Sequence, residues 1–269
     1  MSKTIGILGC GWLGQPLAIS FVKDGYKVHG STSSEEKQAK LSKEGIHPFT
    51  IVLSDNQIKG NLKGFLKNID TLIITIPPKS KGLHKENSTH KMQCLADAIK
   101  TFKIKKVLFV SSTSVYGDVQ GDISENTVPQ PTTNASRQLL QSENIFRNQT
   151  GVQTTVIRFG GLIGPNRHPA TSLSGKKQLS NGNTVVNLIH LDDCIGIIRA
   201  ILQNDWWQET FNGVSPEHPK KEDYYTLEAK KRNLLPPSYL KKSTGKNKKI
   251  DSYTLISVKN YRFTTSIRS

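Results

Sequence analysis

The sequence predicts an α/β protein in which a doubly wound parallel sheet carries helices on both faces. Three observations lead to this prediction. Short apolar runs alternate along the chain with segments whose apolar residues recur at helical spacing. The runs are continuously apolar, as in strands buried on both faces, and the first of them ends in glycines. This alternation is typical of βαβ units joined into one sheet, and 269 residues can bury its core without disulfides.

The elements follow one another in chain order. Residues 4–8 form a short apolar run that ends in glycines, which indicates a buried strand. Leu13, Leu17, Phe21 and Val22 recur at helical spacing, so a helix follows. Further strands are predicted at 26–30, 49–53, 71–76, 107–110 and 154–159, and further helices at 35–43, around 92–99 and at 135–146.

The regular alternation of predicted strands and helices ends after residue 159. Residues 160–183 are rich in Gly, Pro, Ser and Asn, and a predicted strand at 185–189 and a helix at 194–202 follow them. Residues 213–249 are charged and interrupted by prolines, and 253–263 alternates only loosely. We find no internal repeat and no low-complexity linker, so this half is predicted to be a small cap on the sheet.

The turn at residues 9–14 reads G-C-G-W-L-G, which is the G-x-G-x-x-G pattern. Between a strand and a helix, this pattern predicts a Rossmann-like fold that binds a dinucleotide. Gly9 permits the tight turn, Gly11 lets a pyrophosphate approach the backbone, and Gly14 lets helix and strand pack closely. The alternative is a glycine turn without a ligand. The residues that we expect to contact the cofactor here are Gly9, Gly11, Trp12, Leu13 and Gly14.

The end of the second strand bears on which dinucleotide binds. NAD sites usually place an acid there for the ribose hydroxyls, but residues 31–34 read S-T-S-S. Three hydroxyls near Lys37 could instead hold a 2′-phosphate, so we favour NADP. These hydroxyls belong to Ser31, Thr32 and Ser33. Because Glu35 and Glu36 follow closely, NAD stays open as the alternative.

Composition excludes several classes of protein. The three cysteines are far apart and odd in number, which excludes a disulfide scaffold and fits a reducing cytoplasm. No Cys/His cluster has metal-ligand spacing, so no metal is expected. No stretch of about 18 apolar residues exists, so no membrane-spanning helix is expected. Glycines and Pro16 interrupt the apolar N-terminal run, which makes a signal peptide the weaker alternative there.

The net charge of +16 first suggests a nucleic acid or an anionic membrane as partner. The excess is uneven, because residues 107–175 carry four Arg, four acids and no Lys. One basic cluster, residues 220–249, holds 10 basic and 3 acidic side chains, and its tyrosines could stack on bases. No RNA-binding motif accompanies it, so we favour a solvated, Lys-rich helix and loop and expect no nucleic-acid partner.

Four segments occur in the order of the motifs of one known family. They are residues 110–117 (V-S-S-T-S-V-Y-G), Glu125 with two following prolines, residues 158–165 (R-F-G-G-L-I-G-P) and residues 187–193 (N-L-I-H-L-D-D). Together they resemble the extended short-chain dehydrogenases/reductases, the NAD(P)-dependent epimerase/dehydratase group. Residues 165–169 and 211–219 are similar to its atypical members, whose active-site residues often deviate.

The resemblance implies a domain division and a class of ligands. Residues 1–165 would form the NAD(P)-binding domain, with its sheet completed by about 184–204. Residues 166–183 and 205–269 would form a C-terminal cap that binds substrate. Gly160, in the loop after the sixth strand, would contact the cofactor. The implied substrate is a small molecule or a nucleotide-linked sugar, and the implied protein is a cytoplasmic enzyme that can form a homodimer.

The catalytic Y-x-x-x-K motif of this family is not present. The matching positions hold Thr133 and Arg137, residues 117–223 contain no Tyr, and residues 107–175 contain no Lys. A Thr hydroxyl cannot act as a base at neutral pH without help, because its proton is held far more tightly than that of a cation-assisted phenol. Arg137 can still bond the ribose hydroxyls and keep a positive charge near the nicotinamide.

Three other residues are candidates for contacts with substrate. Ser112 matches the substrate-orienting Ser/Thr of the family, and the alternative is a hydroxyl that bonds its own backbone. Arg167 and His168 follow the loop after the sixth strand, near the crevice where α/β sheets bind ligands. We expect Arg167 to bind an anionic group and His168 to help in proton transfer. A solvated loop is the alternative, and the buried I-H-x-x-D signature is expected to be structural.

Three functions fit these observations. The first is an NAD(P)-dependent oxidoreductase or epimerase that acts on a small or nucleotide-linked sugar. The second is a cofactor-binding protein with little or no catalysis, such as a sensor, which the missing Tyr and Lys favour. The third, RNA binding by a reductase-like fold, rests on the charge alone.

Overall fold

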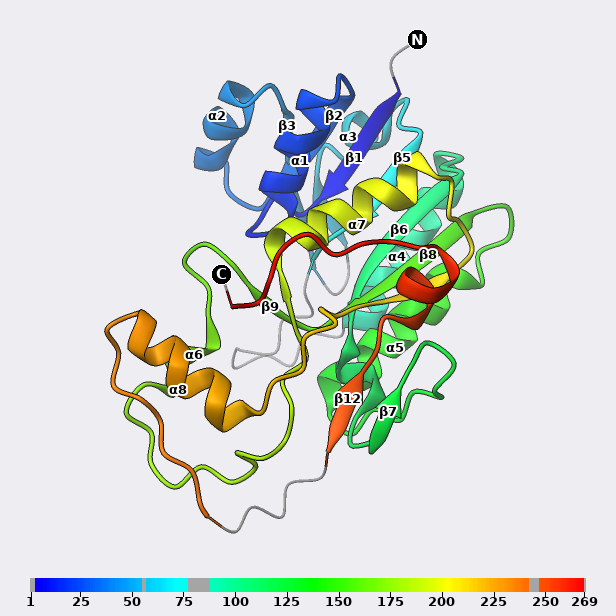
Figure 1. Ribbon diagram of the computed structural model, residues 1–269. Coiled ribbons are helices and arrows are strands. Elements are labelled where there is room, and N and C mark those ends of the chain that lie inside the picture. Colours follow the sequence, from blue (N-terminus) through cyan, green and yellow to red (C-terminus); the bar gives the residue numbers. More distant parts are fainter. Residues whose placement is uncertain (1–2, 55–56, 77–87, 242–246, 269) are drawn as a thin grey trace. The chain divides into compact units, whose positions relative to one another are not determined.

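The computed structural model describes residues 3–54, 57–76, 88–241 and 247–268 (Figure 1). The chain divides into two compact units, each of which consists of three segments. Unit 1 comprises Met1–Val115, Pro131–Ile157 and Ile198–Thr210. Unit 2 comprises Tyr116–Gln130, Arg158–Ile197 and Phe211–Ser269. This division differs from the expected boundary at residue 165, because the chain enters unit 2 for the first time at Tyr116.

Eight strands form the main sheet, in the order β11-β8-β6-β5-β1-β2-β3-β4. β1 pairs in parallel with β2 and β5, and the edge strand β4 is antiparallel to β3. All five residues of β1 are buried. The strands are β1 (Thr4–Leu8), β2 (Lys27–Thr32), β3 (His47–Leu53), β4 (Ile58–Gly60), β5 (Thr71–Ile74), β6 (Lys106–Ser112), β8 (Gln153–Phe159) and β11 (Thr210–Gly213). The predicted α/β fold with a mostly parallel sheet is confirmed, and the six predicted strands each lie within two residues of the observed bounds.

α1 (Gly14–Lys23) buries Leu17 and Phe21, two of the apolar residues whose spacing predicted this helix. α5 (Asn134–Arg147) buries the polar residues Ser136, Ser142 and Glu143 beside Leu139 and Phe146. The capping box at Thr133 explains why α5 begins at Asn134. The other helices are α2 (Glu36–Lys43), α3 (Leu62–Leu66), α4 (Ser88–Thr101), α6 (Pro169–Leu173), α7 (Leu191–Gln203) and α8 (Lys221–Lys231).

We expected residues 184–204 to complete the main sheet, but the structure shows that they do not. β10 (Leu188–His190) pairs instead with β9 (Gly161–Ile163) in a separate two-stranded sheet. Two strands of the main sheet, β4 and β11, were not predicted from the sequence, and β11 stands at the edge next to β8. The reason is local: β11 is four residues long and ends in Asn and Gly, two residue types that are depleted in strands.

Unit 2 has its own apolar cluster and short pairings. β7 (Gly121–Ile123) pairs in parallel with β12 (Lys248–Ile250), and a π-helix, η2 (Thr254–Val258), follows. The apolar cluster joins residues that are distant in sequence, which are Ile163, Val186, Leu188, Tyr224, Tyr225 and Ile267. Ile267 is 1% exposed, so the C-terminal segment belongs to the core of this unit.

A buried asparagine connects three segments of unit 2. Asn212 is fully buried, and its Oδ1 accepts a hydrogen bond of 2.8 Å from the Tyr116 hydroxyl. Its Nδ2 donates to the Asp251 carbonyl at 3.0 Å, and its backbone N–H donates to Glu125 Oε1 at 2.9 Å. The Tyr116 hydroxyl in turn accepts from Arg158 Nη1 at 3.0 Å. Every one of these buried polar groups therefore has a partner within the unit.

Replacing Asn212 tests this network. Asn212→Ala leaves the Tyr116 hydroxyl and the Asp251 carbonyl without this partner, so we expect the free energy of unfolding to fall by about 3 kcal/mol. Urea denaturation measures this change, and Asn126→Ala at an exposed site is the matched control. A loss below about 1 kcal/mol for Asn212→Ala would show that the network does not stabilise the unit.

Candidate functional site

The glycine loop joins β1 to α1 in unit 1, at the carboxyl end of β1. Gly9 has a φ of +108°, in the left-handed region that favours glycine. A Cβ on Gly14 would lie 2.1 Å from the Gly9 carbonyl oxygen, so the close contact requires glycine there. A Cβ on Gly11 would meet nothing within 4 Å. The fold thus fixes Gly9 and Gly14, whereas Gly11 leaves open space beside the backbone.

Trp12 and Leu13 form the turn that enters α1, and Leu13 is its N-cap without a side-chain capping bond. Backbone N–H groups at the start of a helix have no partner inside the helix and attract anions. Because the open side of Gly11 adjoins this turn, the loop offers both space and N–H donors for a pyrophosphate. Burial raises the pKa of the Cys10 thiol to about 12, so the thiol is neutral and fills space within the loop.

The hydroxyls expected to hold a 2′-phosphate are mostly engaged inside unit 1. Ser31 is 2% exposed, and its Oγ accepts the Gly9 N–H at 2.9 Å. Thr32 is also buried, and its Oγ1 accepts the Ser34 N–H at 3.2 Å. Ser33 is exposed. Of the three predicted hydroxyls, Ser33 alone is presented to solvent.

The structure places the three predicted catalytic residues of unit 1 near element ends. Ser112 ends β6, and its Oγ accepts the Ser114 N–H at 3.1 Å, which is the backbone bond foreseen as the alternative. Thr133 is the N-cap of α5, and its Oγ1 accepts the Ser136 N–H at 3.1 Å. Arg137 is exposed, one turn further on, and donates to the Thr132 carbonyl at 3.0 Å. The Thr133 hydroxyl therefore serves the helix start.

Two residues of unit 1 that were not predicted from the sequence form hydrogen bonds next to these candidates. Thr75, directly after β5, donates from Oγ1 to the Gly9 carbonyl at 2.7 Å. Glu143 of α5 is fully buried, and its Oε1 accepts the Ser111 hydroxyl at 2.5 Å, beside Ser112. A hydroxyl residue at the end of a parallel strand next to the glycine loop is the pattern that could have revealed Thr75.

In unit 2, Gly160 has a packing role. A Cβ there would lie 2.7 Å from the Asn187 carbonyl oxygen, and the Gly160 N–H donates to the Gly213 carbonyl at 3.0 Å. Asp193 of the I-H-x-x-D signature is fully buried and accepts bonds from Thr264 and Thr265 at 2.8 to 3.1 Å. These contacts support the structural role expected for Asp193.

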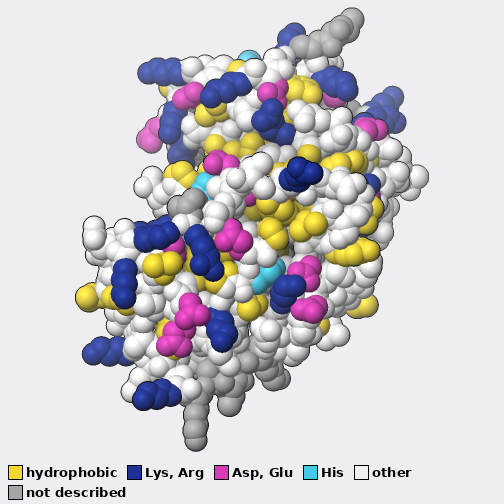
Figure 2. Space-filling view, in the orientation of Figure 1, with side chains coloured by type: hydrophobic (Ala, Val, Ile, Leu, Met, Phe, Trp, Pro, Cys, Tyr) yellow, Lys and Arg dark blue, Asp and Glu magenta, His cyan; other side chains and the backbone are white. Residues whose placement is uncertain are grey.

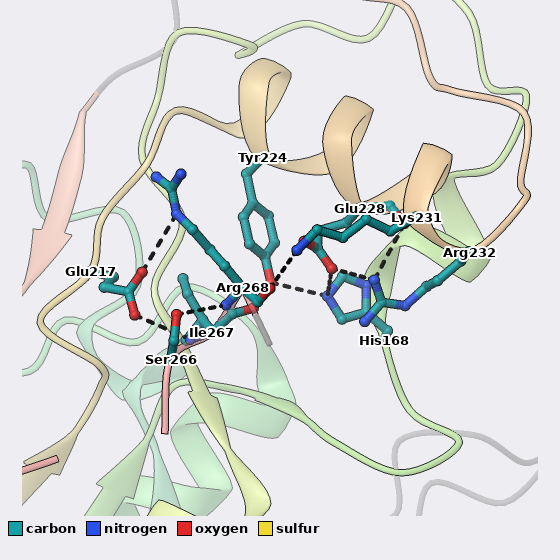
Figure 3. A network of polar contacts seen from close by, with 9 residues as sticks. All are labelled: His168, Glu217, Tyr224, Glu228, Lys231, Arg232, Ser266, Ile267 and Arg268. Carbon is teal, nitrogen blue, oxygen red and sulfur yellow. Dashed lines mark hydrogen bonds and ion pairs between the residues drawn. The ribbon is translucent and has the colours of Figure 1, made fainter. Parts of the chain in front are cut away.

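His168 lies in a network of polar contacts around α8 (Figure 3). Its side chain is 5% exposed and caps α6, because Nδ1 accepts the Ala170 N–H at 3.1 Å. Nε2 lies 3.0 Å from the Tyr224 hydroxyl, which donates to the Ile267 carbonyl at 2.8 Å. With Nδ1 accepting and the Tyr224 proton used, Nε2 carries the proton of a neutral ring. Both nitrogens serve structural contacts, which leaves the expected proton-transfer role without support.

Charged groups surround this imidazole. Fully buried Glu228 pairs with Arg232 and Lys231, and one of its oxygens lies 3.8 Å from His168 Nε2. Burial, aided by Arg232, lowers the pKa of His168 to about 4, although Glu228 opposes the shift. Arg167 is exposed, in a turn where its backbone exchanges two bonds of 3.0 Å with Gly164.

In its described part, the basic cluster at 220–249 buries two of the three tyrosines that could stack on bases, whereas Tyr239 is half-buried. Tyr224 and Tyr225 of α8 are 2% and 8% exposed, so their rings are not available to bases. Lys242 and Lys246 lie outside the described residues. On the face in Figure 2, Lys and Arg side chains are interspersed with Asp and Glu. Among the described residues, no group of His, Cys, Asp and Glu could hold a metal ion, and no helix is long and apolar enough to cross a membrane.

The low pKa of His168 predicts a pH-dependent stability. The folded value of about 4 lies below the ordinary 6.5, so the unfolded chain binds more protons between these values. The free energy of unfolding should therefore fall as the pH is lowered from about 6.5 to 4, by at most about 3 kcal/mol from this group. His168→Asn keeps a capping acceptor and removes the titrating ring, so urea denaturation at pH 7 and pH 4.5 should show a smaller fall. Equal falls in both proteins would contradict this assignment.

The sequence profile of the NAD dependent epimerase/dehydratase family matches residues 5–212. Protein YeeZ of Escherichia coli (strain K12) is 34% identical over 251 residues, which cover 93% of this chain and 91% of YeeZ. The uncharacterized UDP-glucose epimerase YtcB of Bacillus subtilis (strain 168) is 25% identical over 175 residues, 57% of this chain and 55% of YtcB.

A solved structure shows the same fold. UDP-glucuronic acid 4-epimerase from Bacillus cereus, in complex with UDP-glucuronic acid and NAD, superposes with a TM-score of 0.79 at 20% identity. The superposition covers 99% of this chain and 96% of the epimerase. Together with the glycine loop and the parallel sheet, these matches show that the chain belongs to the NAD dependent epimerase/dehydratase family.

Proposed function

We propose that this protein binds a nicotinamide dinucleotide in unit 1 and acts as an oxidoreductase or epimerase on a sugar nucleotide. The observation that carries the proposal is the glycine loop, where the backbone is open at Gly11 and enters a helix N-terminus. When bound, the dinucleotide would take up and return a hydride. The residues of the chain would bind it, orient it and keep water from it.

A UDP-sugar is the substrate class that we propose. The Bacillus cereus epimerase holds UDP-glucuronic acid together with NAD, and YtcB is described as a UDP-glucose epimerase. Arg167 is exposed in unit 2, and its guanidinium suits a diphosphate or carboxylate. In unit 1 we assign Ser112 to orient the substrate and Arg137 to bond the ribose of the cofactor.

The choice between NAD and NADP follows from the end of β2. Ser31 and Thr32 use their hydroxyls within unit 1, so the preference for NADP now depends on Ser33 and Lys37. The Bacillus cereus epimerase was solved with NAD. We therefore propose NAD as the cofactor and keep NADP as the competing possibility for the binding experiment.

A second function is favoured by one observation. The Thr133 hydroxyl, at the position of the family's catalytic Tyr, is held in the capping box of α5. A hydroxyl with that task is a poor acid or base, and residues 117–223 provide no phenol. This arrangement suits a protein that binds the cofactor with little or no turnover and reports its level.

Titration with reduced dinucleotides tests the cofactor proposal. We expect NADH to bind at least as tightly as NADPH, with both read from nicotinamide fluorescence. Gly11→Ala should weaken both by more than about tenfold, because the added methyl occupies the open side of the loop. Its melting temperature should match the wild type, since that methyl meets no neighbour. If NADPH binds tenfold more tightly than NADH, NADP is the preferred cofactor. If neither reduced dinucleotide binds, the proposal is refuted.

An assay with UDP-glucuronic acid and UDP-glucose separates the two functions. If the protein is an epimerase, incubation with NAD and either sugar nucleotide yields a second sugar isomer, detected by NMR, and Ser112→Ala slows its formation. If the protein is a sensor, the wild type binds NADH yet forms no product. The double variant Thr133→Tyr with Arg137→Lys would then gain turnover, because it restores the phenol and its cation.

A further inference from the structure

The glycine loop follows β1, a strand that has a neighbouring strand on either side. β1 pairs with β2 and with β5, and all three run parallel, so their carboxyl ends meet at one edge of unit 1. Ser31 lies in β2, and Thr75 directly follows β5. Each neighbouring strand thus brings one hydroxyl to the loop that follows β1.

These two hydroxyls bind the two polar backbone groups of Gly9, which belong to the successive peptide units on either side of its Cα. Ser31 Oγ accepts the Gly9 N–H at 2.9 Å, and Thr75 Oγ1 donates to the Gly9 carbonyl at 2.7 Å. Backbone bonds flank both contacts, because the Cys10 N–H donates to the Ser31 carbonyl at 2.7 Å and the Thr75 N–H to the Leu8 carbonyl at 3.0 Å. Both polar groups of Gly9 are therefore held by side chains of adjacent strands.

This arrangement matters because a glycine side chain does not by itself fix the backbone conformation. Glycine populates positive and negative φ about equally, and Gly9 must keep a φ of +108° for the loop to turn. Its carbonyl also accepts the Gly11 N–H at 2.7 Å, so the orientation of the Gly9 peptide sets the position of Gly11. A loop that is already held in its binding shape loses less conformational entropy when a ligand binds.

We propose that Ser31 and Thr75 are positioning residues that hold the glycine loop ready for the dinucleotide, an inference that rests on the proposed cofactor binding. Both hydroxyls are engaged with the Gly9 backbone, so we assign neither of them to the 2′-position of the ribose. Ser31, which the sequence assigned to a 2′-phosphate, points to Gly9 instead. Loss of either hydroxyl should consequently weaken NADH and NADPH binding by the same factor.

Two variants on opposite strands test this inference. Thr75→Val and Ser31→Ala remove one hydroxyl each, and both should raise the dissociation constants of NADH and NADPH about tenfold while leaving their ratio unchanged. Thr75→Ser keeps the hydroxyl and should restore tight binding, which a purely steric role would not explain. Thr150→Val, at an exposed threonine of unit 1, is the matched control. Should Thr75→Val not fold, Ser31→Ala carries the test from β2.

The possible failures can be told apart. Wild-type affinity in a folded Thr75→Val or Ser31→Ala overturns the inference, as does weak binding by Thr75→Ser. A loss confined to NADPH in Ser31→Ala would also overturn it, because it would show a direct contact with the 2′-phosphate. If the wild-type protein binds neither dinucleotide, the proposed function itself is wrong.

Discussion

The parallel pairing of β1 with β2 and β5 is the constraint on which unit 1 depends. Parallel strands end at one edge of a sheet, so the loops that follow them are neighbours although they are far apart in sequence. This pairing brings Ser31 and Thr75 to the glycine loop from either side. The same edge carries the end of β6, where Ser112 lies. The proposed ligand site at this edge thus follows first from strand direction and only then from the side chains that line it.

The sequence predicts those parts of the fold whose signal is local. Continuous apolar runs identified six strands, and helical spacing identified α1 and α4. β11 was not predicted because it is short and contains Asn212, a polar residue that is buried through bonds to Tyr116, Glu125 and Asp251. No pattern within four residues reveals partners so distant along the chain. The separate pairing of β9 with β10 escaped for the same reason.

The candidate site shows a similar limit. The glycines could be read from the motif, because their roles are properties of the backbone. The roles of hydroxyls and imidazoles depend on what else is near, and two predictions changed accordingly. Ser31 accepts the Gly9 N–H in the glycine loop, and His168 caps α6 and contacts Tyr224. Polar residues that look available in a sequence are often already engaged in the folded protein, since buried polar groups require partners.

The chain passes between the two units five times, since each unit consists of three segments. Residues 1–115 supply β1 to β6 in one piece. Unit 2 instead draws its elements from three segments that alternate along the chain with those of unit 1. Interleaving has an evolutionary consequence: unit 2 cannot be exchanged as a cassette by a single recombination event, so new specificities must arise by substitution within it.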